Sequence, residues 1–519
     1  MRESARPMLR HHLPPRSRMS SSKQPPSDRA RNPAQAQPRT SWLKRLSAGL
    51  ITGAADDDPS GIATYSQAGA KYGVGTLWSV LLSIPLMVAI QAASAMIGRT
   101  TGKGLARNMA CRFPPWLVRT LAVWVAIANV INLGADIAAM GASVQLLAGG
   151  PRLLYSTLAA LLSLGLQVFV PFSRYSPYLK VLTFSLFAYV GTLFVVHVPW
   201  KEALTALVIP QIQWKADYAV TIVAILGTTI SPYLFYWQAA QEVEELRHDP
   251  ERDPLDQAPE QAPQARRRIR IDTVVGMLYS NTVAFCIMLT AAVVLHAHGK
   301  TEIQTSVDAA AALRPVAGPL AFALFAAGIF GTGLLAVPVL AGSTAFFLAD
   351  AWERPCGLEK KPREARVFYA LLVASVLLGT ALTLTPIDPM KALFWSAVIN
   401  GVAAVPLMAV IVLLAGDRRV MGGACGGALG EVGWVGGHRG DGGGGCGDVC
   451  DAAGAGWLIP FGGAFFCADA IVCHLGVGRD LFCGIAWFLR YRDLAAYAAG
   501  ISDACRRPGH FLFAGPKRK

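Results

Sequence analysis

Ten stretches of the chain are apolar over about 20 residues or more, the length an α-helix needs to cross roughly 30 Å of hydrocarbon. Charged residues make up only 15% of the 519 residues, and they crowd into the segments between these stretches. The sequence therefore predicts an all-α, polytopic membrane protein with about ten to eleven transmembrane helices, and it excludes a soluble enzyme or a disulfide scaffold. The stretches lie at about 47–70, 75–97, 117–148, 153–172, 177–198, 218–240, 273–297, 318–348, 367–385 and 392–415.

The net charge of +14 would suggest a nucleic-acid partner in a soluble chain, but here membrane topology accounts for it. Basic residues gather in every second connection and in the N-terminal tail. The positive-inside rule places these segments in the cytoplasm, with the lipid bilayer of the cell (inner) membrane as the expected surroundings. The basic connections contain Arg99 to Arg112, Arg174 to Lys180, Arg247 to Arg270, Arg354 to Arg366, and Arg418 with Arg419.

Two of the ten spans are interrupted by glycine, proline and polar residues, at 53–61 and at 227–233. The interruptions open the first and the second set of five spans, about 47–198 and 218–416. Because five is odd, the two halves have opposite orientations in the membrane. Inverted repeats with broken helices are typical of secondary transporters, in which unwound backbone lines a site near the membrane midplane. We therefore expect a transporter domain at 47–416 whose substrate binds at the breaks.

The first break contains three consecutive acids, Asp56, Asp57 and Asp58, followed by Pro59 and Gly61. A carboxylate within a span costs about 2.5–3.5 kcal/mol, so it should face a partner or a water-filled path. Unwinding at the proline and glycine lets one or two of the acids converge on a cation, and their oxygens suit a hard divalent ion. The alternative is that an aspartate before proline only caps the half-helix that follows.

The second break, with Gly227 and Pro232, offers neutral oxygens. Ser231 supplies a hydroxyl, and the carbonyls of Thr228 and Ile230 lose helical partners because proline has no N–H group. Together with the carbonyl near Ala55, these groups would complete an oxygen site around Asp58. The alternative is a plain proline kink stabilised by threonine and serine side chains.

A further intramembrane acid, Asp136, follows Asn132 in the third span. It is a candidate proton carrier or a supporting residue of the cation site, and a structural pairing with a buried hydroxyl or cation is equally open. Asparagines in spans either hydrogen-bond between helices or line a path. They are Asn129, Asn132, Asn281 and Asn400.

These motifs resemble the NRAMP family of divalent metal transporters, which adopt a LeuT-type fold. The family sequence Asp-Pro-Gly-Asn corresponds to Asp58-Pro59-Ser60-Gly61, and Gly-Ala-Thr-Val-Met-Pro-His corresponds to residues 227–233. The resemblance covers about residues 45–420 and implies a metal site with Asp58, Gly61 and Ser231, together with Ala55 and Thr228. It implies a supporting or proton-carrying role for Asp57, Asp136 and Tyr233.

Two departures from the family pattern concern the chemistry of the site. Ser231 stands where the family has methionine, and Tyr233 stands where it has histidine. A thioether favours softer transition metals, whereas hydroxyls and carbonyls favour hard cations. The sequence thus looks like the NRAMP-related magnesium transporter branch, with Mg²⁺, Mn²⁺ and also Fe²⁺ as candidate substrates. Without the histidine, Asp58 and Asp136 are the remaining internal proton carriers.

We therefore interpret the chain as a transporter, not an enzyme, that moves a divalent cation by alternating access and needs no cofactor beyond that substrate. One alternative keeps the fold but transports an organic solute such as an amino acid with sodium. Three aspartates argue against it, because they would repel a carboxylate substrate. A non-transporting receptor is a third hypothesis, which the paired interior breaks disfavour. No Walker loop is present, so pumping driven by ATP is not expected.

The two ends of the chain differ in composition from the apolar domain. Residues 1–46 are rich in arginine, proline and serine, and we expect a disordered cytoplasmic tail. The tail at 417–519 is rich in glycine and cysteine from about Met421 on, where an eleventh span would be expected. We interpret it as the product of a frameshift. A zinc site with Cys425, His438, Cys446 and Cys450 is the alternative, but their spacing matches no zinc pattern.

Overall fold

The computed structural model describes residues 53, 55–170, 174, 186–249, 251–358 and 360–422. All of them belong to one compact unit that begins at Arg45. The expected N-terminal tail, the hypothesis of a frameshifted tail and the candidate zinc ligands lie outside the described residues.

Every regular element in these ranges is a helix. The longer ones are α3 (Pro59–Tyr72), α4 (Trp78–Thr101), α6 (Pro115–Ala148), α7 (Arg152–Phe169), α11 (Ala216–Thr229), α12 (Pro232–His248), α13 (Ala262–Val294), α16 (Ala321–Ala351), α17 (Arg366–Leu382) and α18 (Pro389–Gly416). The shorter ones are α5 (Leu105–Arg112), α9 (Phe187–Val195), α10 (Trp200–Val208), α14 (Ser306–Ala310), α15 (Arg314–Ala317) and α19 (Arg418–Met421).

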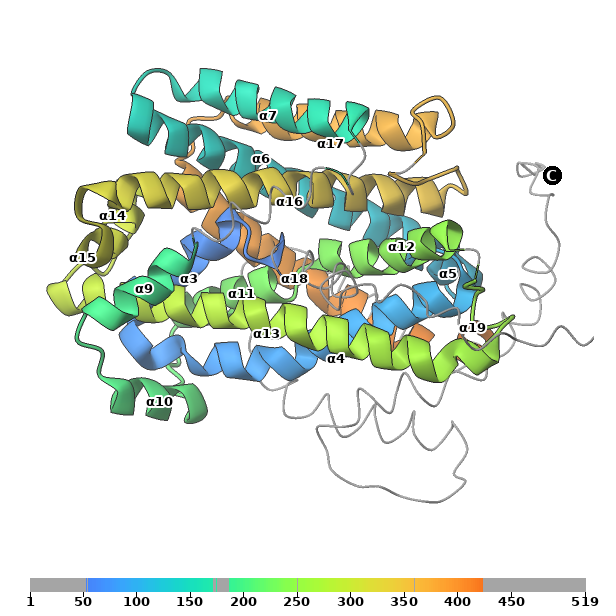
Figure 1. Cartoon of the computed structure of the whole chain (residues 1–519), viewed down its shortest axis with the longest axis horizontal. Helices are drawn as coiled ribbons and strands as arrows, with labels where there is room; N and C mark the ends of the chain where they lie inside the picture. The colour runs from blue at the N-terminus through green and yellow to red at the C-terminus, as the bar shows by residue number, and fades with distance from the viewer. Residues whose placement is uncertain are drawn as a thin grey trace, which may run out of the picture. The chain divides into compact units, whose positions relative to one another are not determined.

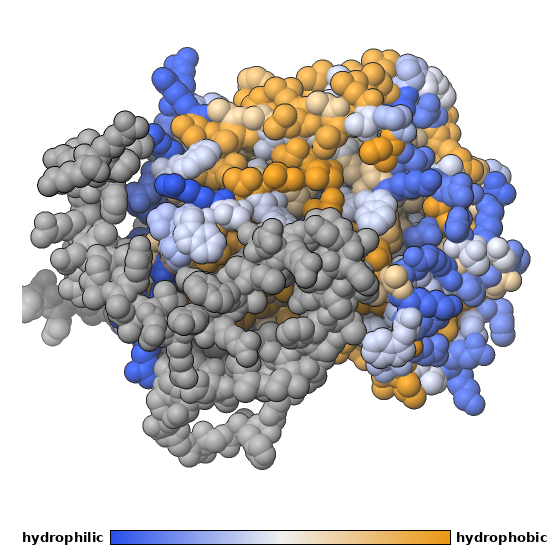
Figure 2. Space-filling model, turned by 180° about the vertical axis from the view of Figure 1, so that it is seen from behind, coloured by the Kyte–Doolittle hydropathy of each residue, from blue (hydrophilic) through white to orange (hydrophobic). Residues whose placement is uncertain are grey.

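The helices have the length and composition of membrane spans. Seven spans in the described residues are long and apolar enough to cross a membrane, with α11 and α12 together forming one of them. The apolar helix α17 is shorter, at 17 residues. Apolar side chains cover the middle of the visible face, and hydrophilic side chains gather toward its two ends (Figure 2). The predicted all-α membrane architecture is therefore confirmed.

Helix contacts repeat between the two halves of the bundle. Helix α3 of the first half packs on α13 of the second, and α12 of the second half packs on α4 of the first. In the same way, α6 contacts α7 and α17, while α16 contacts α17 and α7. Helices α7 and α17 lie side by side along one edge, over α6 and α16 (Figure 1). In each of these pairs, a helix of one half packs on the other half in the same way as its counterpart does. Two repeats of opposite orientation produce such paired contacts.

Both predicted breaks are present. The chain is helical at Ala55 and Asp56, leaves the helical conformation at Asp57 and Asp58, and resumes with α3 at Pro59. Helix α11 ends at Thr229, and α12 begins at Pro232 after two non-helical residues. From these breaks α3 and α12 run toward opposite ends of the bundle (Figure 1).

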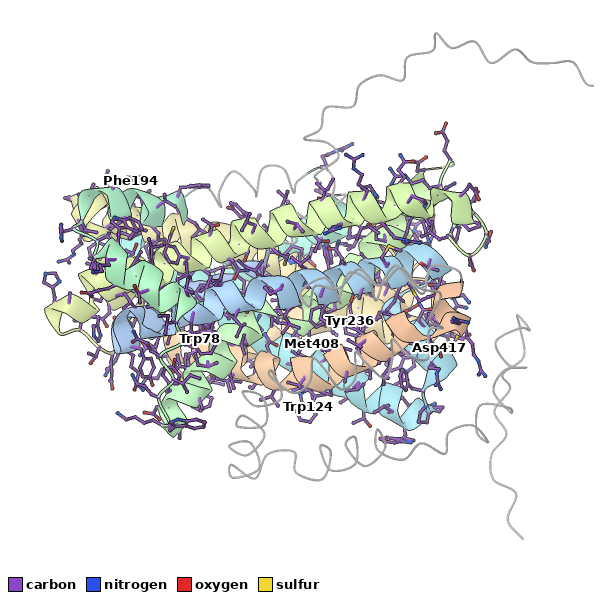
Figure 3. All side chains as sticks on the ribbon, turned by 90° about the horizontal axis from the view of Figure 1, so that it is seen from below. Trp78, Trp124, Phe194, Tyr236, Met408 and Asp417 are labelled. Carbon is purple, nitrogen blue, oxygen red and sulfur yellow. The ribbon has the colours of Figure 1, made fainter. Side chains whose placement is uncertain are left out.

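Basic connections that the structure describes, among them those with Arg99, Arg112 and Arg252, gather at one end, as the charge alternation predicts. Arg112 Nε lies 2.6 Å from Asp417 Oδ2, and Arg99 Nη1 donates to the carbonyl of Asp253 at 2.6 Å. In Figure 3, Asp417 marks this basic end, while Trp78 lies toward the opposite end. There the indole N–H of Trp78 donates a hydrogen bond to the Tyr218 hydroxyl at 2.9 Å.

The start of the seventh span differs from the prediction. Helix α13 begins at Ala262, not near residue 273, and its first turns carry arginines that were assigned to a connection. Arg268 on this segment pairs with Glu242 and with Glu245 of α12, while Ala265 and Ile269 are buried. Ion pairs and a buried stripe therefore extend the helix beyond its apolar part.

Glycine at 227 allows α11 to touch α18 backbone to backbone. A Cβ atom added there would lie 2.0 Å from the carbonyl oxygen of Ala397, and one added at Gly401 would lie 2.5 Å from that of Val223. The residue expected to help break the helix therefore also sets the distance between two helices.

We expect Gly227→Ala to lower the free energy of unfolding by about 1–3 kcal/mol or more, because backbone atoms cannot move aside as a flexible side chain can. The thermal midpoint of the detergent-solubilised protein measures this. Gly165→Ala on α7 is the matched control, since nothing lies within 4 Å of its added Cβ. Equal midpoints for the two variants would contradict the close-packing role.

Candidate metal site

Asp58 stands at the first break and uses one carboxylate oxygen to start a helix. Its Oδ1 accepts from the backbone N–H of Gly61 at 2.8 Å and from the Ser60 hydroxyl at 2.5 Å. Pro59 follows as the first helical residue, where its missing N–H group costs nothing. The capping role is therefore present, and Gly61 serves it with its N–H group.

The second oxygen of Asp58 faces two other helices. Oδ2 accepts from Asn132 Nδ2 of α6 at 3.0 Å and lies 3.4 Å from the Tyr233 hydroxyl of α12. The Asn132 amide oxygen lies 2.8 Å from the Ser396 hydroxyl of α18. All four side chains are buried, so the carboxylate contacts α6 and α12 directly and α18 through Asn132.

Tyr233 connects the two breaks. Its hydroxyl lies 3.1 Å from the carbonyl oxygen of Ala55 and can donate its single hydrogen there or to Asp58. The structure thus gathers a carboxylate, a carbonyl, a phenol and an amide around one point. The carboxylate, the carbonyl and the phenol offer oxygen to a cation, whereas Asn132 presents its amide N–H group to Asp58.

Ser231 and Thr228 lie in the second break but are engaged locally. The Ser231 hydroxyl lies 2.9 Å from the carbonyl oxygen of Gly227 and 2.8 Å from that of Thr228, which the sequence suggested would be unpartnered. The Thr228 hydroxyl lies 2.9 Å from the carbonyl oxygen of Ile225 and 3.1 Å from the Tyr65 hydroxyl of α3. Thr228 thus contacts the helix that follows the first break, and neither Thr228 nor Ser231 is hydrogen-bonded to Asp58 among the described residues.

Asp56 and Asp57 turn toward α13, away from Asn132. The Ser280 hydroxyl lies 2.7 Å from Asp56 Oδ2 and 3.1 Å from Asp57 Oδ1. This hydroxyl has one hydrogen and can donate to only one carboxylate at a time. The other oxygens, Asp56 Oδ1 and Asp57 Oδ2, have no hydrogen-bond partner among the described residues. Two ionised acids at this depth are costly unless they are paired or face water, and Ser280 provides a single hydrogen for both of them.

Asp136 is fully buried on α6, one turn after Asn132 and therefore on the same helix face. Neither of its carboxylate oxygens has a hydrogen-bond partner among the described residues. Asn129 instead donates to Thr344 at 3.0 Å, and Asn281 accepts from Ser83 at 2.9 Å, so both bind between helices. Both polar atoms of Asn400 are unpartnered within the described ranges.

No group of three or more histidine, cysteine, aspartate or glutamate side chains is placed to hold a metal in the part of the chain that the structure describes. The three aspartates are split between two directions, Asp58 toward Asn132 and the other two toward Ser280. A cation at Asp58 would thus have one carboxylate and otherwise neutral oxygens.

Three contributors were missed by the sequence analysis: Tyr65, Ser280 and Ser396. A single serine in an apolar helix has no signal of its own, because most such hydroxyls bond to a carbonyl one turn earlier. The Ser396 hydroxyl also lies 2.8 Å from the carbonyl oxygen of Leu393, so its single hydrogen goes either there or to Asn132. Only the packing of α13 and α18 shows which serines face the acids.

The sequence model of the Nramp family, described as natural resistance-associated macrophage protein-like, matches residues 49–436. The chain belongs to the Nramp family. A Chromohalobacter salexigens protein named divalent metal cation transporter MntH is 29% identical over 322 residues, which are 59% of this chain and 69% of the relative. Its namesake in Aeromonas hydrophila is 26% identical over 375 residues, 70% of this chain and 85% of the relative.

Solved structures show the same fold. The Eremococcus coleocola manganese transporter superposes with a TM-score of 0.58 at 15% identity, over 85% of this chain and 96% of that one. Mhp1, a nucleobase-cation-symport-1 family transporter, gives 0.50 at 14% identity, over 72% and 78% of the two chains. These likenesses confirm the predicted LeuT-type fold of an Nramp protein.

Removing the Ser280 hydroxyl should leave Asp56 and Asp57 without their shared donor. We expect Ser280→Ala to lower the free energy of unfolding by about 1–3 kcal/mol, the cost of a buried polar group that loses its partner. Thermal unfolding in detergent measures the change. Ser375→Ala is the control, because that hydroxyl donates only to a backbone carbonyl of its own helix, at 2.8 Å. A shift no larger than that of the control would count against the pairing.

Proposed function

We propose that this protein carries divalent metal cations, Mg²⁺ and Mn²⁺ and also Fe²⁺, across the cell membrane by alternating access. The observation that supports the proposal most is a buried carboxylate, Asp58, at the meeting point of two broken helices, with oxygen groups around it. The names of the curated relatives, divalent metal cation transporters, point to the same class of substrate.

In this proposal Asp58 binds the ion through Oδ2, and the Ala55 carbonyl and Tyr233 hydroxyl supply further oxygens. Asn132, which now donates to Asp58, would turn its amide oxygen to the ion or hold the carboxylate in place. Gly61 keeps the other carboxylate oxygen in the helix cap. Ser231 and the Thr228 carbonyl would join the ion when the second break opens, since their oxygens now bind each other.

Hard ions fit this donor set best. No sulfur atom is offered at position 231, and Mg²⁺ and Mn²⁺ prefer carboxylate, carbonyl and water oxygens. Asp136 and Asp57 are the proposed proton carriers or supporting acids, because both are buried beside the ion-binding carboxylate. An organic carboxylate substrate is disfavoured, since none of the side chains hydrogen-bonded to Asp58 among the described residues is basic.

The topology follows from the same charge rule. The basic end of the bundle would face the cytoplasm, and the N-terminus would lie on that side as well.

Asp58→Asn tests the ion-binding role without removing the cap, because asparagine is as good an N-cap as aspartate. We expect uptake of Mn²⁺ and Mg²⁺ into proteoliposomes to be lost in this variant, since the charge that offsets the ion is gone. Asp388→Asn is the matched control, because Asp388 also caps a helix before proline and accepts from the Met390 N–H at 2.9 Å. Uptake retained by Asp58→Asn, or lost equally in the control, would refute the role.

Ser231→Met tests the choice of ion by restoring the thioether of the family pattern. The ratio of Mn²⁺ to Mg²⁺ uptake should rise by about tenfold, because sulfur binds the softer ion and cannot replace the oxygen shell of Mg²⁺. Ser231→Ala separates this effect from the mere loss of the hydroxyl and should leave the ratio near that of the wild type. An unchanged ratio in the methionine variant would argue that position 231 does not face the ion.

A further inference from the structure

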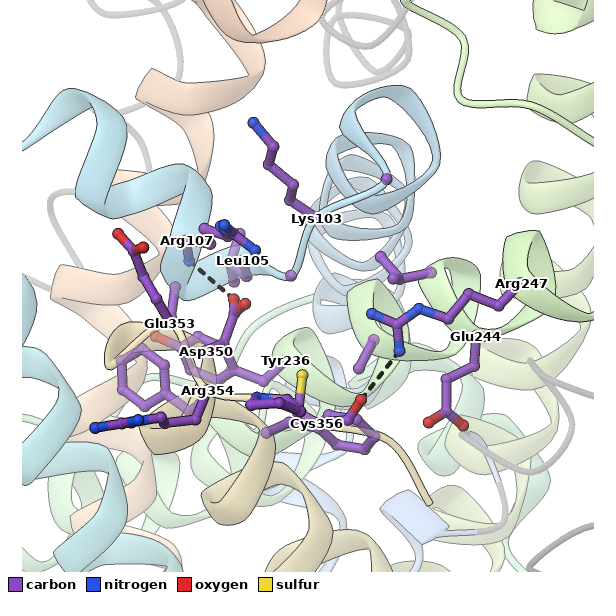
Figure 4. Close-up of a pocket in the computed structure, with 18 of the residues that line it drawn as sticks. Lys103, Leu105, Arg107, Tyr236, Glu244, Arg247, Asp350, Glu353, Arg354 and Cys356 are labelled. Carbon is purple, nitrogen blue, oxygen red and sulfur yellow. Dashed lines mark hydrogen bonds between the residues drawn. The ribbon is translucent and has the colours of Figure 1, made fainter. Parts of the chain in front are cut away.

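A cavity of about 280 Å³ lies at the basic end of the bundle. Its walls are the start of α5 with the segment before it, one face of α12 from Tyr236 to Arg247, the end of α16 and the connection after α16 (Figure 4). Tyr236 and Phe347 form part of its lining and stack with ring centroids 4.0 Å apart. The metal site proposed above lies elsewhere, since neither Asp58 nor its partners line this cavity.

The lining carries more positive than negative side chains. Five are cationic and three are acidic, a surplus of two positive charges. The cations are Lys103, Arg107, Arg247, Arg354 and Lys360, and the acids are Glu244, Asp350 and Glu353. Such a wall repels a free divalent cation and attracts an anion.

Two of the acids are occupied by backbone N–H groups. Asp350 Oδ2 accepts from the N–H of Arg107 at 2.9 Å, and Glu244 Oε1 accepts from that of Leu358 at 2.7 Å. These bonds hold the walls together and direct carboxylate oxygens to the backbone. They leave fewer acidic oxygens to neutralise the cations.

Most of the cations have no carboxylate in contact. Within the described ranges, none of Lys103, Arg107, Arg354 and Lys360 takes part in an ion pair. Arg247 donates to the carbonyl of Cys356 at 3.0 Å, the bond drawn across the cavity in Figure 4. Guanidinium groups present forked donors that match phosphate oxygens.

We propose that this cavity binds a small phosphate-bearing anion. Its volume is at the lower end for ligand sites, which suits a phosphate or pyrophosphate group better than a whole nucleotide. The group belongs either to a free phosphate compound or to the headgroup of an anionic lipid, because basic pockets at this membrane face take both.

Binding would connect parts that belong to different helices. Arg107 comes from α5, Arg247 from α12, and Arg354 with Lys360 from the connection after α16. A bound phosphate would therefore hold α12, the half-helix that follows the second break, against α5 and α16.

Calorimetric titration of the full-length protein with inorganic pyrophosphate tests the proposal, in detergent and in metal-free buffer. We expect saturable binding that chloride at equal ionic strength does not reproduce. Arg107→Gln combined with Arg354→Gln should weaken it by about a hundredfold, roughly tenfold for each charge-assisted contact. Neither arginine forms an ion pair among the described residues, and the bond from the Arg107 backbone N–H to Asp350 is kept in the double variant.

Arg363→Gln is the control, because Arg363 is an exposed arginine of the same connection that does not line the cavity. No saturable binding, or equal weakening in the control, would overturn the proposal. Because no metal or transport is involved, that result would leave the proposed function untouched.

The source of the phosphate is decided in nanodiscs. Native mass spectrometry would count phosphatidic acid retained by the wild type and by the double variant. Retention that the double variant loses, with pyrophosphate binding only after delipidation, identifies a lipid headgroup. Pyrophosphate binding that phosphatidic acid does not displace identifies a free phosphate compound.

Discussion

The structure depends on one carboxylate that sits inside the membrane at the end of a helix. Asp58 uses Oδ1 to cap α3 and directs Oδ2 to α6 and α12. The cap thus occupies one oxygen, and the ion-binding role that we propose for this side chain would fall to the other. The cap fixes the carboxylate in one orientation, so its second oxygen already points to the centre of the bundle. An ion that binds there would not have to order the Asp58 side chain, which lowers the entropic cost of binding.

Breaks could be predicted from the sequence because their signal is local. Glycine, proline and polar residues within an apolar run indicate unwinding wherever they occur. Both breaks lie within the predicted segments, 53–61 and 227–233. The partners of the breaks could not be predicted. Ser280 and Ser396 are ordinary helix serines until the packing of α13 and α18 turns them toward Asp56 and Asn132.

Two sequence-based expectations were altered by tertiary contacts. Helix α13 starts earlier than hydropathy suggests, because Arg268 finds acids on α12 that stabilise a polar first segment. Ser231 was expected to offer a free hydroxyl, but this hydroxyl lies 2.9 Å from the carbonyl oxygen of Gly227 and 2.8 Å from that of Thr228, which Pro232 leaves without a helical partner. Hydropathy averages over neighbours in sequence and does not register such pairings in space.

The repeated contacts between the halves have an energetic consequence for a carrier. Several packing arrangements of the first repeat have a counterpart in the second, such as α3 on α13 and α12 on α4. In the proposed alternating-access cycle, opening one end of the bundle while closing the other would exchange contacts of the same kind, which would keep the free energies of the two states close. A small preference of the bound ion for one arrangement would then be enough to move the population from one state to the other.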